Sequence, residues 1–487
     1  MANIDINLSE AIVTRFKGNT QTDTISDDLG VFFQVDRSFT SSHAVSTSYA
    51  LTSNSLRLNY ADGAYENATG LALADPNATS GAATIASLEE YVPSAYSLTT
   101  TGQLNYHYDI TGSTLNIQPQ SGTIKAATFQ TLLPTTSPNY NATLGNAIFI
   151  MDGNVDLSTS GGISGVVTSF TMMAERNVAL TSLIGNFTVS GDTASVAQDT
   201  STLKVSGTAT AYSELYNDGS IVSMTDIAIP VTGGSSMNKT LLANGDNLPG
   251  DDVINVTLGA VAANPWNIAS GAGNDKIAIK GGGSSLSVNA GTGNDTITLA
   301  DDNHAVDGGD GVDTAVLNGA MKNYSITHTT TGYTVTGSGG VDTLTGIERL
   351  QFSDATVALD INGHGGQVYR LYQAAFNRVP DAGGLGFWIK AADNGASMQT
   401  IAAEFAKSDE FKSMYGANPS NADFLDKLYH NVLHRAGDTG GFNWWLGHLD
   451  AHDITQASVL AEFGESAENQ AALIGSISNG FTYTPYG

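Results

Sequence analysis

The chain has 487 residues and a formal net charge of −28 at pH 7, from 19 Lys and Arg against 47 Asp and Glu. This length predicts about three domains, and the negative charge repels phosphate backbones and anionic membranes, so we expect no nucleic-acid partner. The absence of Cys excludes disulfides, Cys-ligated metal sites and thiol nucleophiles. No apolar run is long enough to span a bilayer or to form an N-terminal secretory signal, so we expect no membrane insertion and no such signal.

Residues 1–240 alternate apolar and polar side chains in short segments rich in Thr, Ser and Asn, which is typical of antiparallel strands. Residues 103–110 and 114–117 flank Thr111 and Gly112 and predict a hairpin, while Asp152-Gly153 and Asp218-Gly219 predict further turns. We therefore expect an all-β, sandwich-like domain that supplies assembly or ligand contacts.

One segment of this region, residues 82–92, has a different spacing. Ile85, Leu88 and Val92 recur at intervals of three and four, and Pro93 follows. This spacing predicts a short helix that ends before the proline.

Residues 241–360 contain fourteen acidic residues, thirteen of them Asp, against four basic ones. A generic surface would mix Glu with Asp. Asp is short, favours turns and holds its carboxylate close to the main chain, as a calcium-binding loop requires.

Three copies of one nonapeptide lie in this acidic segment, beginning at Ser270, Ala290 and Gly308, and each fits Gly-Gly-x-Gly-x-Asp-x-apolar-x with at most one Gly replaced. In a parallel β-roll, six residues of such a repeat turn around Ca²⁺ and three form a strand. The glycines allow positive φ and let carbonyls converge, while the Asp supplies a charged oxygen. The candidate calcium-binding residues are therefore Gly271, Gly273, Asn274, Asp275, Gly291, Gly293, Asn294, Asp295, Gly308, Gly309, Asp310, Gly311 and Asp313.

These residues resemble the RTX (haemolysin-type) calcium-binding repeats, and residues 342–354 resemble the segment that commonly follows them. The resemblance implies calcium as the cofactor and export through a type I secretion apparatus, directed by a signal near the C-terminus, after Ala471 here. It also implies an extracellular or cell-surface protein that folds on external Ca²⁺. With three good copies, we expect a short roll and few ions.

Residues 361–487 have apolar side chains at helical spacing and contain an internal duplication, in which residues 371–388 match residues 428–445 at a constant offset. This domain resembles a bacterial domain of unknown function often found after RTX repeats and distantly similar to phycobilisome linker domains. We expect an Arg–carboxylate clamp on the turn of each copy and three tryptophans in the core. The clamp residues are Arg378, Asp381, Arg435 and Asp438, and the tryptophans are Trp388, Trp444 and Trp445.

The sequence contains no zinc-protease motif of the form His-Glu-x-x-His; the nearest string, His430 to His434, has Asn431 at its second position. His448 and His452 repeat the same spacing, which would place each pair one helical turn apart. The string around Ser164 also fails as a nucleophile elbow. We expect no enzyme, although a glycosidase's paired carboxylates are close only in space and leave no sequence motif.

The predicted function is that of a secreted, calcium-dependent bacterial surface protein with a structural or adhesive role, such as a surface-layer subunit, matrix component or adhesin. Its expected partners are further copies of itself and, as a further candidate, cell-surface glycans. Two alternatives stay open. One is a secreted hydrolase of polysaccharides or esters with its site in residues 1–240, and the other is an extracellular binder of haem or siderophores.

Overall fold

The computed structural model describes residues 48–75, 78, 80–111, 114–132, 134–137, 146–158, 160, 162–174, 178–192, 204–215, 221–232, 248, 250–257, 266–280 and 286–486. The chain divides into two compact units. The first unit comprises residues 1–263 with 270–272, and the second comprises residues 264–269 with 273–487. The predicted turn at Asp218-Gly219 lies outside the described residues.

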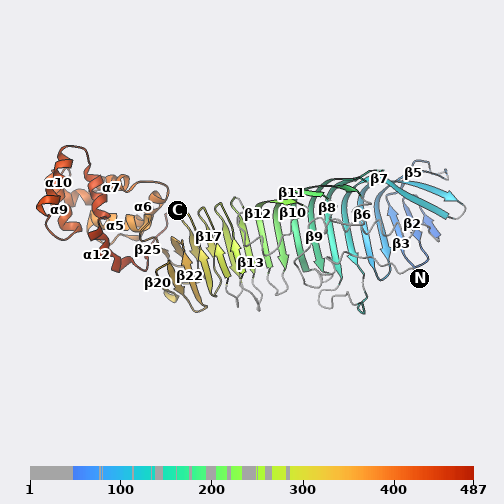
Figure 1. Cartoon of the computed structure of the whole chain (residues 1–487), viewed down its shortest axis with the longest axis horizontal. Helices are drawn as coiled ribbons and strands as arrows, with labels where there is room; N and C mark the ends of the chain where they lie inside the picture. The colour runs from blue at the N-terminus through green and yellow to red at the C-terminus, as the bar shows by residue number, and fades with distance from the viewer. Residues whose placement is uncertain are drawn as a thin grey trace. The chain divides into compact units, whose positions relative to one another are not determined.

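The described part of the first unit is all β, as predicted. Its strands hydrogen-bond into one long antiparallel sheet, not into two facing sheets as in a sandwich, and neighbours in the chain are mostly neighbours in the sheet (Figure 1). The strands are β1 (Ser48–Leu51), β2 (Ser55–Asn59), β3 (Tyr65–Thr69), β4 (Ala72–Leu73), β5 (Ser80–Val92), β6 (Tyr96–Thr111), β7 (Thr114–Thr131), β8 (Ala147–Leu157), β9 (Gly162–Ala174), β10 (Val178–Asp192), β11 (Lys204–Leu215), β12 (Ile221–Thr232) and β13 (Val253–Thr257).

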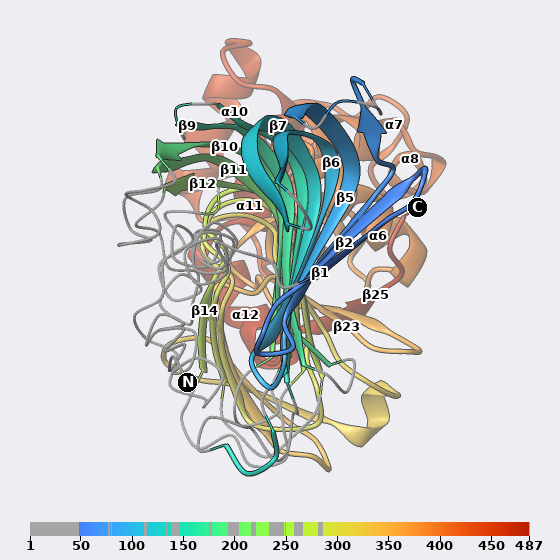
Figure 2. The ribbon, with the colours of Figure 1, turned by 90° about the vertical axis from the view of Figure 1, so that its right-hand side faces the viewer.

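A row of β-bulges crosses this sheet from β5 to β12, with each register shift opposite the shift in the next strand. Bulges bend strands and increase their twist, and Figure 2 shows the long strands curving along their length. At Gly153 an added Cβ would lie 2.4 Å from the Val166 carbonyl oxygen, so the close approach of the two strands requires glycine there. The predicted turn at Asp152-Gly153 is therefore wrong, because this pair forms a bulge inside β8.

The predicted hairpin of β6 and β7 is confirmed, with Thr111 paired to Thr114. The predicted helix at residues 82–92 is wrong, because these residues belong to β5. A bulge between Ile85 and Ser87 moves the buried side chains from odd to even positions, so that Leu88 is buried after Ile85. One shift of this kind turns a spacing of two into a spacing of three, which the sequence presents as helical.

One face of the sheet is the core of this unit. Aromatic rings from four neighbouring strands contact one another across it. The ring centroids are 5.7 Å apart for Tyr96 and Phe129, 5.8 Å for Phe129 and Phe149, and 6.3 Å for Phe149 and Phe170. Contacts at these separations add to the stabilisation from burial alone.

The second unit begins with a parallel β-roll, as predicted, in which each coil places one strand in each of two sheets. Parallel strands β15, β17, β19 and β23 form one sheet, and β14, β16, β18 and β22 form the other. Antiparallel strands follow at the last coil, β24 and β25 in the first sheet and β21 and β20 in the second. The strands are β14 (Trp266–Ala269), β15 (Lys276–Lys280), β16 (Leu286–Asn289), β17 (Thr296–Thr298), β18 (His304–Asp307), β19 (Thr314–Val316), β20 (Ser325–His328), β21 (Tyr333–Thr336), β22 (Val341–Thr345), β23 (Arg349–Gln351), β24 (Thr356–Ala358) and β25 (Phe481–Tyr483), with a 3-10 turn η3 (Met321–Asn323).

Helices follow the roll and share one apolar core. They are α5 (His364–Phe376), α6 (Ala382–Asp393), α7 (Met398–Lys407), α8 (Asp409–Tyr415), α9 (Asn421–Val432), α10 (Thr439–Asp450), α11 (Gln456–Gly464) and α12 (Ala467–Ile477). The side chains of Asp381 and Asp438 cap the matching helices α6 and α10 by accepting hydrogen bonds from Gly384 N and Gly441 N. None of the helices in the described residues is long and apolar enough to cross a membrane.

Candidate metal centre

The three nonapeptide turns of the roll repeat one backbone geometry. Gly271, Gly291 and Gly309 have φ of 96°, 100° and 91°, and the glycines two positions later, Gly273, Gly293 and Gly311, have φ of 136°, 125° and 146°. L side chains rarely adopt such angles. The sequence pattern therefore marks the two positions in each turn that require glycine.

Successive turns lie in direct backbone contact. Gly293 N donates to the Asp310 carbonyl at 2.8 Å, and Asp310 N donates to the Gly291 carbonyl at 2.9 Å. An added Cβ on Gly293 would lie 1.9 Å from the Gly273 carbonyl oxygen, and one on Gly311 would lie 1.8 Å from the Gly293 oxygen. These approaches leave no room for a side chain at Gly293 or Gly311.

The repeat aspartates form a ladder along one edge of the roll. The Asp275 N–H donates to Asp295 Oδ1 at 2.7 Å, and the Asp295 N–H donates to Asp313 Oδ1 at 2.8 Å. The three residues are 1%, 1% and 0% exposed. A second ladder runs beside it, because Asn274 Oδ1 accepts from Asn294 N and Asn294 Oδ1 accepts from Val312 N, both at 2.8 Å. The predicted residues of the second and third turns are thus brought together as the repeat spacing implies.

A buried carboxylate ladder favours a bound cation. Burial raises the pKa of Asp313 to about 6, with further contributions from the charges of Glu348, Asp307 and Asp310. Among the described residues Asp313 Oδ2 has no hydrogen-bond partner. A fully buried carboxylate oxygen without a donor is costly unless a cation neutralises it. Asp313 therefore fits the charged ligand of a calcium site whose other ligands include backbone carbonyls.

No group of three or more His, Asp or Glu side chains in the described parts of the chain is arranged to hold a metal ion by itself. The metal role of the thirteen repeat residues stays a prediction.

The opposite edge of the roll has a residue that the sequence did not single out. His304 is buried. In the sequence it lies nine residues after Asp295 and nine before Asp313, at the position where a nine-residue repeat would place another Asp. Its Nδ1 lies 2.8 Å from Asp342 Oδ1, and its backbone N donates to the same oxygen at 3.1 Å. The His304–Asp342 pair thus joins the coils on that edge by side-chain contact.

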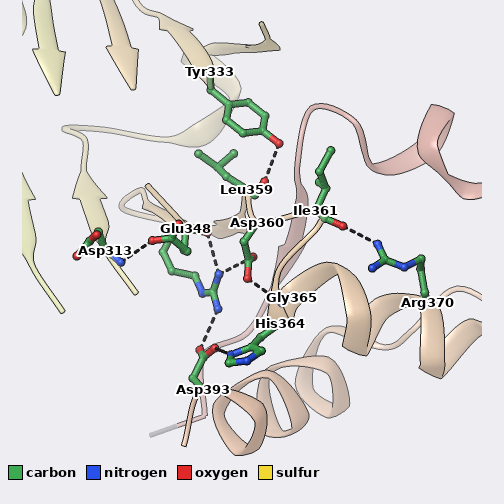
Figure 3. Close-up of polar contacts among 11 residues, drawn as sticks. Asp313, Tyr333, Glu348, Leu359, Asp360, Ile361, His364, Gly365, Arg370 and Asp393 are labelled. Atoms are coloured by element: carbon green, nitrogen blue, oxygen red, sulfur yellow. Dashed lines mark hydrogen bonds and ion pairs between the residues drawn. The ribbon is translucent and has the colours of Figure 1, made fainter. Parts of the chain in front are cut away.

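Sequence reasoning also missed the cluster at the end of the roll (Figure 3). Arg349, in β23, is 4% exposed and donates to Asp360 Oδ1 at 2.6 Å and to Asp393 Oδ2 at 2.9 Å. Burial alone would lower the pKa of Arg349, but the charges of Asp360 and Asp393 raise it, so the guanidinium stays charged. Burial raises the pKa of Asp360 in spite of Arg349. The only signal for this cluster in the sequence is a lone Arg in an acidic segment.

In the helical region the predicted clamps need correction. Arg378 pairs with both oxygens of Glu410, at 2.6 and 3.0 Å, and lies 3.7 Å from Asp381. Arg435 pairs in the same way with Glu468, at 2.9 and 2.8 Å. Arg378, in the turn after α5, therefore contacts α8, and Arg435, in the turn after α9, contacts α12, while the two Asp side chains serve as helix caps.

The predicted tryptophan core is confirmed for Trp388 and Trp445, which pack against the helical core. It is wrong for Trp444, which is 56% exposed and lies against the ring of His448. The two His pairs do not share a helix face, because His434 and His452 follow the ends of α9 and α10 with φ of 52° and 60°.

Residues 364–412 and 402–473 match a domain of unknown function, DUF4214. The matches cover less than half of the chain and overlap, in keeping with the duplication. Among solved structures, the extracellular lipase LipA from Serratia marcescens matches with 19% identity and a TM-score of 0.18, over 20% of this chain and 18% of that chain. No curated protein matches. The chain thus spans less than a fifth of the lipase's length.

The stacking of the turns predicts the effect of a single methyl group. Gly293→Ala places a side chain at φ 125° and 1.9 Å from a carbonyl oxygen. The strained backbone and the clash together should lower the free energy of unfolding by at least about 3 kcal/mol. Gly475→Ala, in α12 with open space around it, should raise stability by about 0.5–1 kcal/mol. Denaturant unfolding measures both, and equal effects would contradict the stacking.

The Arg349 cluster predicts a second effect on stability. Arg349→Met leaves Asp360 and Asp393 without their buried counter-charge and should lower the free energy of unfolding by about 3–5 kcal/mol. Lys407→Met removes an exposed ion pair with Glu404 and should cost less than about 1 kcal/mol. Denaturant unfolding measures both changes, and a small effect of Arg349→Met would show that the cluster contributes little.

Proposed function

We propose that this protein is a secreted, calcium-dependent bacterial surface protein with a structural or adhesive role. The observation that carries the proposal is the buried ladder from Asp275 through Asp295 to Asp313 on turns whose glycines repeat the same positive φ angles. This arrangement concentrates negative charge in a site that Ca²⁺ would neutralise. Extracellular Ca²⁺ is abundant, whereas cytosolic Ca²⁺ is scarce, so the roll would close after export.

Three further features support an extracellular, assembling protein. The net charge of −28 and the absence of Cys suit a protein that works outside the cell and needs neither a reducing compartment nor a nucleic-acid partner. The long sheet in the first unit is rich in Thr and Ser, and hydroxyls such as those of Thr171 and Ser182 contact one another across strands at 3.2 Å. A broad hydroxyl-rich sheet offers contacts to further copies or to glycans. The proposed export route is the type I apparatus that the RTX resemblance implies.

The two alternatives are a secreted hydrolase with its site in residues 1–240 and an extracellular binder of haem or siderophores, and no specific contact in the described residues favours either. Turnover of a polysaccharide or ester panel by the purified chain would establish the first. An absorbance band from bound haem or siderophore would establish the second.

Calcium should stabilise the protein, because an ion that binds only the folded roll adds about 2.7 kcal/mol at a hundred times its Kd. We expect Ca²⁺ to raise the melting temperature and Mg²⁺ to do so far less, since Mg²⁺ requires near-ideal octahedral geometry. Asp295→Asn keeps the acceptor for the Asp275 N–H but loses the charge, and should weaken calcium affinity about tenfold or more. Asp354→Asn, outside the ladder, is the matched control. Melting unaffected by chelator would refute the calcium role.

Assembly is tested separately by negative-stain microscopy of the purified chain. Ordered lattices or filaments in Ca²⁺ that disappear in chelator would support the structural role. Monomers under both conditions, together with calcium-dependent melting, would leave a calcium-dependent protein whose role is not self-assembly.

A further inference from the structure

The duplication in the helical domain places one surface position in two different surroundings. The matching helices α6 and α10 both contain twelve residues and keep the constant offset of the repeat. On this alignment Trp444 corresponds to Phe387, and Asn443 corresponds to Gly386. Trp444 is 56% exposed and Phe387 is 40% exposed. The contacts of the two rings show how the second copy differs from the first.

In the first copy, the residues after β25 lie over this position. The ring of Tyr486 meets that of Phe387 edge to face, with the centroids 4.9 Å apart. Thr484 N donates to the Ala382 carbonyl at 2.9 Å. An added Cβ on Gly386 would lie 1.8 Å from the Thr484 carbonyl oxygen, so this close contact requires glycine. The second copy has Asn in place of that glycine, so a main-chain segment cannot approach α10 in the same way.

In the second copy, the exposed indole of Trp444 is held by two neighbouring rings. Its centroid lies 4.7 Å from that of Trp445 and 4.3 Å from that of His448, which stands where the first copy has Ala391. Trp445 packs against the helical core. The imidazole of His448 is itself fixed, because its Nδ1 lies 2.8 Å from Asp453 Oδ2. A side chain that is oriented before binding loses little conformational entropy when a ligand binds.

Hydrogen-bonding groups border this ring on the helix surface. Asn443 is exposed, and its amide offers both donors and an acceptor. Because Asp453 engages Nδ1 of His448, Nε2 is the imidazole atom that can bond a ligand. Gly447 lies three residues after Trp444, on the same side of the helix, and no atom lies within 4 Å of an added Cβ there. A ligand can therefore approach the indole across bare backbone.

This set of groups matches a neutral sugar ring. A pyranose presents C–H groups on its faces, which pack against an indole, and hydroxyls around its rim, which pair with an amide and an imidazole. The net charge of −28 disfavours an anionic ligand. The nearby carboxylates are engaged, Asp453 by His448 and Asp450 by Asn421 Nδ2 at 2.8 Å, which disfavours a cationic ligand.

A protein partner would need a broader apolar surface than this helix has. Stable protein–protein interfaces take about 20–30 residues from each side. Within α10, all of which the structure describes, Trp444 is the only large hydrophobic side chain that is mostly exposed. A single ring bordered by polar groups suits a small ligand better.

We propose that Asn443, Trp444 and His448 form a binding site for a neutral saccharide on α10. The indole packs against the C–H face of one sugar ring, while the amide and the imidazole bond its hydroxyls. The inference rests on the proposed adhesive role and deepens it, because it names the class of ligand and assigns the contact to the second copy of the helical repeat.

The first test measures binding of the full-length chain, in Ca²⁺, to immobilised dextran, mannan, galactan and chitin oligosaccharides by surface plasmon resonance. The wild type should bind at least one of these probes, and Trp444→Ala should weaken that binding about tenfold or more. Phe387→Ala, the same position in the first copy, is the matched control and should bind as the wild type does. Binding to none of the probes, or equal binding by Trp444→Ala, would overturn the inference.

A second readout locates the sugar. The bound probe should shield tryptophan emission from quenching by acrylamide, and Trp444→Phe, which keeps a ring for stacking, should lose most of this shielding while still binding. Unchanged shielding in Trp444→Phe would place the sugar elsewhere and overturn the inference.

Sedimentation and melting separate this inference from its rivals. A change of oligomeric state in Trp444→Ala with unchanged sugar binding would assign the residue to an interface between copies and overturn the inference. Melting that is independent of Ca²⁺, together with sugar binding that depends on Trp444, would overturn the calcium role and support this site. Calcium-dependent melting without sugar binding would overturn this site alone.

Discussion

The close stacking of six-residue turns is the constraint on which the roll depends. Backbone contact between successive turns, which glycine alone permits at Gly293, places the Asp of one coil within hydrogen-bond distance of the amide before it in the stack. Each contact satisfies a buried amide, but together they bury a row of like charges that a folded protein cannot keep without compensation. The calcium ion that we propose would resolve this conflict between hydrogen bonding and charge. The fold of the roll and the proposed dependence on calcium thus have one physical origin.

At the end of the roll, side chains of the protein itself compensate buried negative charge. At the last coil Arg349 supplies a fixed positive charge between Asp360 and Asp393, and it follows directly on Glu348, the last rung of the ladder. On the opposite edge His304 replaces Asp and contacts Asp342. Within the second unit, the strand β25 then pairs with β24, and Thr484 N donates to the Ala382 carbonyl of α6. The helices and the roll therefore share contacts at this end.

Residue type and spacing predicted the features that depend on residues close together in the sequence. The positive φ glycines, the three Asp rungs and the change from strands to helices after Asn362 all follow from residue type and spacing. The spacing misled at 82–92, because a bulge at Ile85 changes the parity of a strand in a way that looks helical. It also could not find Glu348 or the full Arg349 cluster, since Asp313 lies 35 positions from Glu348 and Asp393 lies 44 positions from Arg349. The pairing of Arg378 with Glu410 required the helix packing, which no short motif encodes.

The central claim is that a cation holds the stacked turns together, and hydrogen exchange at the ladder amides tests it most directly. The amides of Asp275, Asp295 and Asp313 donate to side-chain carboxylates of the next coil, so their protection reports on the stack itself. Exchange measured by mass spectrometry over residues 270–313 should be slow in Ca²⁺ and faster by orders of magnitude in chelator, while the helical core stays protected for longer. Equal protection of these peptides with and without Ca²⁺ would contradict the account.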